Sequence, residues 1–115
     1  MKLRPQTIDD VEMVLTGLLG VIGLVKRGNR QQLDDGAFSY AHQVVVNAEG
    51  PLRRLGMYEA TLNAIVESER LVNTGQLDDA DVPVLTIARE MMDKSGTNAR
   101  LRKRYTPTKS TAEDS

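Results

Sequence analysis

The run Met13–Val25 constrains the fold of this 115-residue chain more than any other feature, because no uncharged run is longer and none is as apolar. Apolar residues in and beside it recur every three or four positions, as on one face of an α-helix: Val11, Val14, Leu15, Leu18, Leu19, Ile22 and Val25. Thr7 stands where a hydroxyl caps a first turn, and Lys26 and Arg27 precede Gly28, which is a typical helix end. The sequence therefore predicts a helix from about Thr7 to Arg27 that is buried on most sides.

The same run is too short to cross a membrane, because a transmembrane helix needs about 20 apolar residues. It follows Asp9, Asp10 and Glu12 rather than a basic stretch, and no small-residue cleavage site follows it. A secretory signal peptide is therefore not expected either. The chain contains no cysteine, which fits a reducing compartment. We expect a cytoplasmic protein that does not enter a membrane.

Three glycines, Gly17, Gly20 and Gly23, interrupt the apolar run at a spacing that places them along one side of a helix. Each destabilises a helix interior by roughly 1 kcal/mol relative to alanine unless something compensates. Two interpretations remain open: close approach of another helix of the same chain, or close approach of the same helix from a second copy. The second interpretation predicts an oligomer interface of Gly17, Gly20, Gly23 and Leu24.

Two further helices are predicted after a polar turn. The first covers Ala37–Ala48, with Asp34 or Asp35 available as its cap. Its apolar face carries Phe38, Ala41, Val45 and Ala48. The second lies within Pro51–Asn73 and is best defined beyond Gly56, which is a possible interruption.

The C-terminal third is predicted to hold one apolar helix and one short basic helix. The first begins after Asp81 as its cap, has Pro83 in its first turn and runs to about Lys94. Its buried residues are expected to be Leu85, Ala88 and Met92, with Val84, Ile87 and Met91 beside them. The second covers Asn98–Tyr105 and is capped by Thr97. The predicted fold is an all-α bundle of four to five helices over residues 1–105, with a flexible polar tail at 106–115.

No residue pattern predicts catalysis, a cofactor or a metal. The acidic cluster consists of Asp78, Asp79 and Asp81. It lacks the alternating ligands, central glycine and distal glutamate of a calcium-binding loop, and helix capping explains it. His42 is the only histidine, and no nucleophile motif surrounds Ser39 or Ser68. The chain also has no glycine-rich nucleotide loop.

Basic residues gather near the C-terminal end of a chain whose net charge is −1. The residues expected to contact nucleic acid are Arg100, Arg102, Lys103, Arg104 and Lys109. Arginines and lysines on a short helix can neutralise phosphates without reading sequence. The alternative is a solvated helix end that balances an acidic neighbour or partner.

The half of the chain from Gly50 onward resembles the C-terminal part of small terminase subunits encoded by actinobacterial phages. The segments that carry the resemblance are Thr61–Ile65, Leu77–Asp81, Leu85–Arg89 and Asn98–Arg102. The N-terminal half departs from that pattern, because Met13–Val25 is neither basic nor a helix-turn-helix.

The resemblance implies a ring-forming, non-catalytic adaptor that helps a large motor subunit engage viral DNA in the cytoplasm of a bacterial host. Its implied partners are other copies of itself, double-stranded DNA and the larger protein subunit. A second hypothesis is a small helical protein-binding or regulatory subunit of a larger nucleoprotein complex, without direct contact to DNA.

Overall fold

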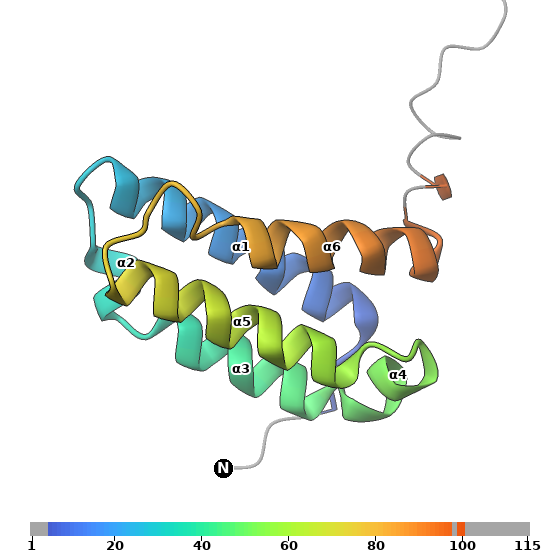
Figure 1. Ribbon diagram of the computed structural model, residues 1–115. Coiled ribbons are helices and arrows are strands. Elements are labelled where there is room, and N and C mark those ends of the chain that lie inside the picture. Colours follow the sequence, from blue (N-terminus) through green and yellow to red (C-terminus); the bar gives the residue numbers. More distant parts are fainter. Residues whose placement is uncertain (1–4, 98, 101–115) are drawn as a thin grey trace, which may run out of the picture.

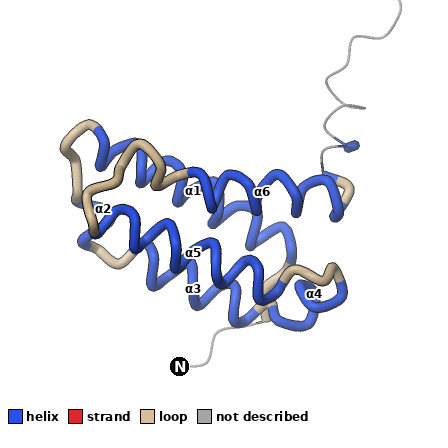
Figure 2. The backbone as a smooth tube through the Cα atoms, viewed as in Figure 1, coloured by secondary structure: helices blue, strands red, loops and turns tan. Residues whose placement is uncertain are grey.

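The structure is a computed structural model that describes residues 5–97, 99 and 100. In this part of the chain every regular element is a helix, as Figure 2 shows. The helices are α1 (Ile8–Lys26), α2 (Gln31–Asp34), α3 (Ala37–Asn47), α4 (Glu49–Arg54), α5 (Tyr58–Asn73) and α6 (Val82–Ser95). The predicted all-α fold class is confirmed.

The four long helices form a bundle in which each one packs against two others. Helix α1 packs against α3 and α6, and α5 packs against the same two helices from the opposite side. The short helices α2 and α4 lie at opposite ends of the bundle, where they connect α1 to α3 and α3 to α5 (Figure 1).

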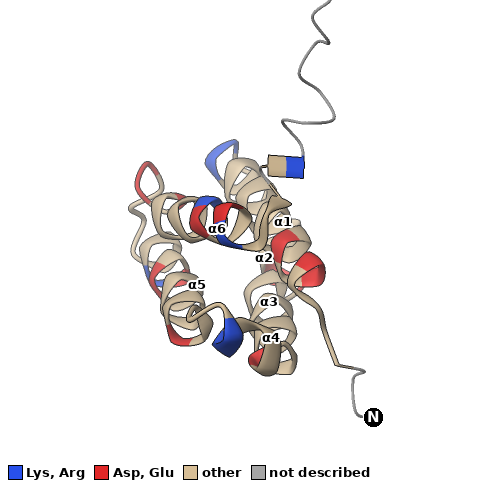
Figure 3. Cartoon of the chain, turned by 90° about the vertical axis from the view of Figure 1, so that its right-hand side faces the viewer, with Lys and Arg blue, Asp and Glu red and all other residues tan. Residues whose placement is uncertain are grey.

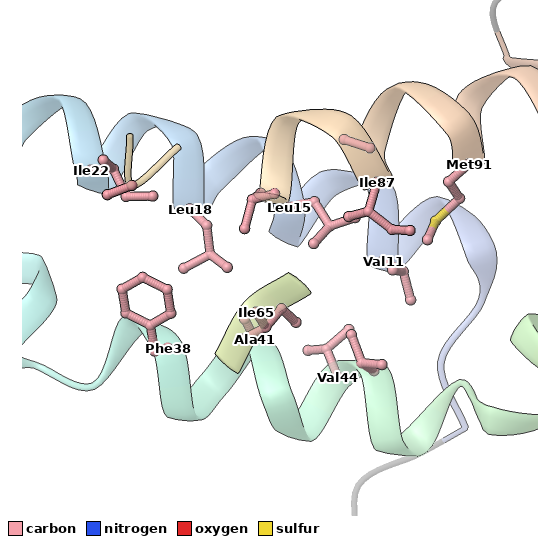
Figure 4. Packing of buried hydrophobic residues seen from close by; sticks show 14 of the residues in the cluster. Val11, Leu15, Leu18, Ile22, Phe38, Ala41, Val44, Ile65, Ile87 and Met91 are labelled. Atoms are coloured by element: carbon pink, nitrogen blue, oxygen red, sulfur yellow. The ribbon is translucent and has the colours of Figure 1, made fainter. Parts of the chain in front are cut away.

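The core fills the centre of the bundle, and α1 contributes more to it than any other helix. Figure 4 shows Leu15 and Leu18 of α1 pointing toward α3, where Phe38 and Ala41 meet them. Further core residues are Val11, Ile22, Val44, Val45, Leu52, Met57, Ile65, Val84, Ile87 and Met91. Burying an aliphatic side chain of this size stabilises a fold by roughly 1.5–3 kcal/mol. The predicted helix is confirmed, but its burial is less complete than expected, because Met13, Thr16, Gly17 and Gly20 are exposed.

The ends of α1 follow from their residues as predicted. The Thr7 hydroxyl accepts a hydrogen bond from the Asp10 amide at 3.2 Å, and the Asp10 carboxylate accepts one from the Thr7 amide at 3.0 Å. This reciprocal pair satisfies two amides that the first turn leaves unbonded. At the other end Gly28 adopts a φ of +89°, which favours glycine, so the helix stops there.

The region predicted as one helix within Pro51–Asn73 holds two helices, α4, which already begins at Glu49, and α5, so the start of the prediction is wrong and the possible interruption at Gly56 is confirmed. Gly56 has a φ of +71°, and the Met57 amide reaches back to the Leu52 carbonyl at 2.9 Å. This turn reverses the chain and brings α5 alongside α3.

The prediction that an aspartate caps α3 is wrong. The cap position is held by Gly36 at a φ of +96°, and no side chain bonds to the first turn there. The Asp35 carboxylate, directly after α2, instead accepts hydrogen bonds from the side-chain amide of Gln31, the first residue of α2. The sequence did not predict this short helix. Glycine adopts this left-handed conformation without the steric cost that other residues meet, so the turn leads into α3 without a side-chain cap.

The predicted buried face of α6 is partly wrong. Ala88 is buried as expected, but Leu85 and Met92 are only half-buried. The buried residues are Val84, Ile87, Ala88 and Met91. Two apolar faces overlap on this helix. The face that is buried is the one that contacts both α1 and α5.

The start of α6 also differs in part from its prediction. Pro83 lies in the first turn as expected, and Asp81 occupies the cap position without making a capping hydrogen bond. The Asp81 carboxylate instead lies 3.6 Å from the Lys26 ammonium of α1. Its role is therefore to pair two neighbouring helix ends.

Most of the predicted basic helix Asn98–Tyr105 and all of the tail at 106–115 lie outside the described residues. Ala99 and Arg100 are described, and both are helical and exposed. Within the described ranges no helix combines the length and the apolar character that crossing a membrane requires.

Candidate interaction surfaces

The glycines of α1 face open space and not another helix of the same chain. Gly17 and Gly20 are exposed and Gly23 is half-buried. A Cβ atom built on any of the three would meet nothing within 4 Å outside its own helix. The interpretation that these glycines admit a neighbouring helix of the same chain is therefore wrong for the part that the structure describes.

Four uncharged residues form a line along the outward side of α1, which we call the outward stripe: Met13, Gly17, Gly20 and Leu24. Their steps of four, three and four residues are the spacing that keeps side chains on one seam between two helices. The Met13 side chain is 73% exposed, and Leu24 is half-buried. Gly23, which the sequence grouped with the other glycines, lies beside the stripe.

A groove of about 540 Å³ runs beside the outward stripe, between α1 and α3. Val14, Gly17 and Val21 line it from α1, and Tyr40 and Val44 line it from α3. The Tyr40 side chain is 60% exposed. The stripe and the groove together make a mostly apolar surface on one side of the bundle, which is typical of protein contact sites.

Of the five residues predicted to contact nucleic acid, the structure describes one. Arg100 is exposed beyond the end of α6. Its Nη1 donates to the Ser95 carbonyl at 3.3 Å and its Nη2 donates to the Thr97 hydroxyl at 2.9 Å. Arg102, Lys103, Arg104 and Lys109 lie outside the described residues.

A buried carboxylate, which the sequence reasoning missed, connects this basic end to α1. Glu12 is 9% exposed and accepts hydrogen bonds from the Ser95 hydroxyl at 2.6 Å and from the Thr97 hydroxyl at 2.8 Å. Its one signal in the sequence is its position directly after Val11, inside the first turns of the apolar helix. Glu12 therefore fixes the segment from which Arg100 projects.

The two arginines of α4 are at the same end of the bundle and differ in their partners. Arg53 bonds to Glu49 at 2.6 Å, lies 3.5 Å from Glu59 and stacks over Tyr58 with 4.7 Å to the ring centroid. The hydrogen bond from Arg53 to Glu49 raises the pKa of the Arg53 guanidinium. Arg54 has no ion pair or hydrogen-bonded side chain among the described residues.

The other candidate groups are not brought together. Among the described residues no three histidine, cysteine or acidic side chains are grouped as a metal site. His42 is exposed on α3, and no hydrogen bond joins it to Ser39 or Ser68 in this part of the chain. Ser68 is fully buried, and its hydroxyl has no hydrogen-bond partner there.

Comparison of the chain with known protein families, with curated proteins and with solved structures finds no match.

Proposed function

We propose that this chain is a non-enzymatic helical adaptor that self-associates through the outward stripe and associates with duplex DNA through its basic C-terminal end. This role agrees with the resemblance of its second half to small terminase subunits. The observation that carries the proposal is that the glycines of α1 face open space.

The energetics of α1 favour a second copy as the occupant of the outward stripe. Glycines in a helix interior lower its stability, and small residues on a helix surface allow two backbones to approach closely. No helix in the described part of the chain makes that approach. A second α1 packed on the stripe would gain these close contacts and remove Met13 from water.

The order of residues along the stripe suits an antiparallel pair. Met13 and Leu24 lie at equal distances from the midpoint of the stripe, as do Gly17 and Gly20. In a two-fold antiparallel pair Met13 therefore meets Leu24 of the second copy, and the glycines meet at the crossing point. The first turn of α1 is acidic and its last turn is basic, so the same arrangement brings opposite charges together.

The nucleic-acid part of the proposal is supported by the position of Arg100. Its guanidinium is exposed at the end of the bundle, and the basic residues Arg102, Lys103 and Arg104 follow it in the sequence. The Glu12 contacts to Ser95 and Thr97 hold the start of this segment to α1. A basic segment whose start is anchored to a helical adaptor is suited to phosphate contacts.

Light scattering tests the self-association. We expect a wild-type mass that is a multiple of 12.7 kDa. Gly20→Leu should give the mass of a monomer while the helical circular dichroism is kept, because the added side chain blocks close approach. Asn63→Leu, which adds the same side chain at an exposed position of α5, is the matched control and should keep the wild-type mass. A wild-type monomer, or an oligomer that survives Gly20→Leu, would contradict the proposed interface.

Duplex DNA binding at low and at moderate salt tests the second part. We expect affinity that falls steeply with salt and is lost when Arg100, Arg102, Lys103 and Arg104 are replaced by alanine. Unchanged binding in that variant would remove the assigned site.

The groove beside the outward stripe supports a second candidate, a regulatory subunit that binds a helix of another protein. That candidate predicts a monomer or dimer without measurable DNA affinity near physiological salt. Because the antiparallel pair is itself a dimer, the DNA-binding experiment is the one that separates the two functions.

A further inference from the structure

An open cleft of about 600 Å³ lies where the start of α1, helix α4 and the end of α6 meet. Cationic side chains from three separate segments line it: Arg54, Lys94 and Arg100. Figure 3 shows this end of the bundle, with basic residues on α4 and on the segment that follows α6. The fold thus brings Arg54, which lies far earlier in the sequence, beside Lys94 and Arg100 near the C-terminal end.

Two of these cations are available to a ligand. Arg54 has no side-chain partner in the described part of the chain, whereas its neighbour Arg53 is held by Glu49 and Glu59. Lys94 pairs with Glu90 at 3.2 Å, and both side chains are about half exposed. An exposed pair of this kind contributes little to stability and exchanges readily for another anion.

The third cation is oriented by the backbone and by a hydroxyl, and a ligand can still reach it. Arg100 donates to the Ser95 carbonyl and to the Thr97 hydroxyl, and that hydroxyl donates in turn to Glu12. The guanidinium group has five N–H donors, so these two contacts leave others for an anion. Its contacts also restrict the side chain before any ligand arrives, which lowers the entropic cost of binding.

The remaining lining of the cleft limits the possible ligand. Ile8 and Leu55 provide apolar walls, and among the described residues Asp9 is the one carboxylate that lines the cleft. With Glu90, which pairs with Lys94, three cations face two carboxylates, so an excess of one positive charge remains. That balance favours an anion with several charged oxygens over a neutral ligand.

We propose that Arg54, Lys94 and Arg100 form a phosphate-binding cleft that contacts the backbone of duplex DNA. This inference rests on the proposed association with DNA, and it adds Arg54 and Lys94 to the residues that contact it. A DNA backbone suits the site because it offers phosphates in a row, and the sequence continues from Arg100 into Arg102, Lys103 and Arg104.

The test compares Arg54→Gln with Arg53→Gln in duplex DNA binding at several salt concentrations. Both variants remove one positive charge from adjacent positions of α4, but only Arg54 lines the cleft. Arg54→Gln should weaken binding about fivefold near 0.1 M salt and lower the salt dependence by about one ion, while Arg53→Gln should stay within about twofold of wild type. Adding Lys94→Gln to Arg54→Gln should weaken binding by about another fivefold. Circular dichroism of each variant should match the wild type.

Asp9→Asn provides a test in the opposite direction. Removing the one carboxylate of the cleft should tighten DNA binding about two- to fivefold, because like charge no longer opposes the phosphates. A residue whose role is only structural would not improve binding when it is replaced. Weaker or unchanged binding by Asp9→Asn would count against the cleft.

Several results would overturn the inference. Equal effects of Arg54→Gln and Arg53→Gln, in a chain that still binds DNA, would remove the cleft and leave the proposed function standing. A wild-type chain that does not bind duplex DNA would remove both. Orthophosphate at matched ionic strength should compete with the DNA for the wild-type cleft, and competition that Arg54→Gln leaves unchanged would also overturn the inference.

Discussion

The inward and outward sides of α1 are built from the same apolar run but meet different surroundings. On the inward side Val11, Leu15 and Ile22 are completely buried by the rest of the bundle. On the outward side Met13 is 73% exposed, and Gly20 has open space around its Cα. The core of one chain therefore accounts for only one side of this helix, and the exposed Met13 and glycines of the other side are the basis of the proposed self-association. The predictions below test this difference, from the largest expected effect to the smallest.

Leu15→Ala should have the largest effect. Leu15 is fully buried at the centre of the bundle, so its truncation removes apolar contacts and leaves a cavity. We expect a loss of about 3–4 kcal/mol in the free energy of unfolding, measured by urea denaturation. Leu24→Ala, on the outward stripe, should lower the stability of the monomer by less than about 1 kcal/mol. Similar losses for the two leucines would show that the two sides of α1 do not differ.

Glu12→Ala should have the next largest effect, because Glu12 is the one charged residue on the buried part of α1. The substitution leaves the hydroxyls of Ser95 and Thr97 without their carboxylate. We expect a loss of about 1–3 kcal/mol in the same measurement. Glu90→Ala, at an exposed acid of α6, is the control and should change the stability by no more than about 0.5 kcal/mol. Equal effects would mean that Glu12 does not anchor the end of α6.

Gly20→Ala should raise the stability of the monomer. Gly20 is helical and has open space for a Cβ atom, so alanine gains about 0.5–1 kcal/mol through helix propensity. Gly28→Ala is the matched control, because Gly28 also has open space but adopts a φ of +89°. It should destabilise the chain by about 1 kcal/mol or more. Unfolding is measured at low protein concentration, where the monomer dominates. A destabilising Gly20→Ala would show that the outward stripe is packed within one chain.

The long helices were predictable because their signals are local. Apolar residues at three- and four-residue spacing placed α1, α3, α5 and α6, and Thr7 with Asp10 set the start of α1. Gly56 ended α4 through its own backbone preference. Each of these features depends on residues within about one helical turn of one another, which is the range over which a sequence pattern can be read directly.

The features that the sequence did not give depend on distant residues. The buried face of α6 was misassigned because Leu85 and Val84 suit a helix face equally well, and only contact with both α1 and α5 selects one. In the sequence Glu12 is only a charge at the edge of the apolar run. Its hydrogen bonds come from the hydroxyls of Ser95 and Thr97, which lie at the far end of the chain. For the same reason the candidate cleft could not be predicted, because its cations meet only in the folded bundle.

Glu67→Gln should have the smallest effect. It measures how much an exposed charge outside α1 contributes to the stability of the fold. A hydrogen bond from Arg70, one turn later on α5, lowers the pKa of the Glu67 carboxyl. A lowered pKa in the folded state means that the stabilising contribution is present above the pKa of the unfolded carboxyl and is lost as the pH falls through the folded value. Because both side chains are about half exposed, water screens the pair. We expect the urea midpoint of Glu67→Gln to equal that of the wild type within error at neutral pH, with no larger difference in acid. A loss of stability comparable to that of Glu12→Ala would mean that exposed ion pairs also stabilise this bundle. The difference in burial between the two sides of α1 would then no longer single out the outward stripe.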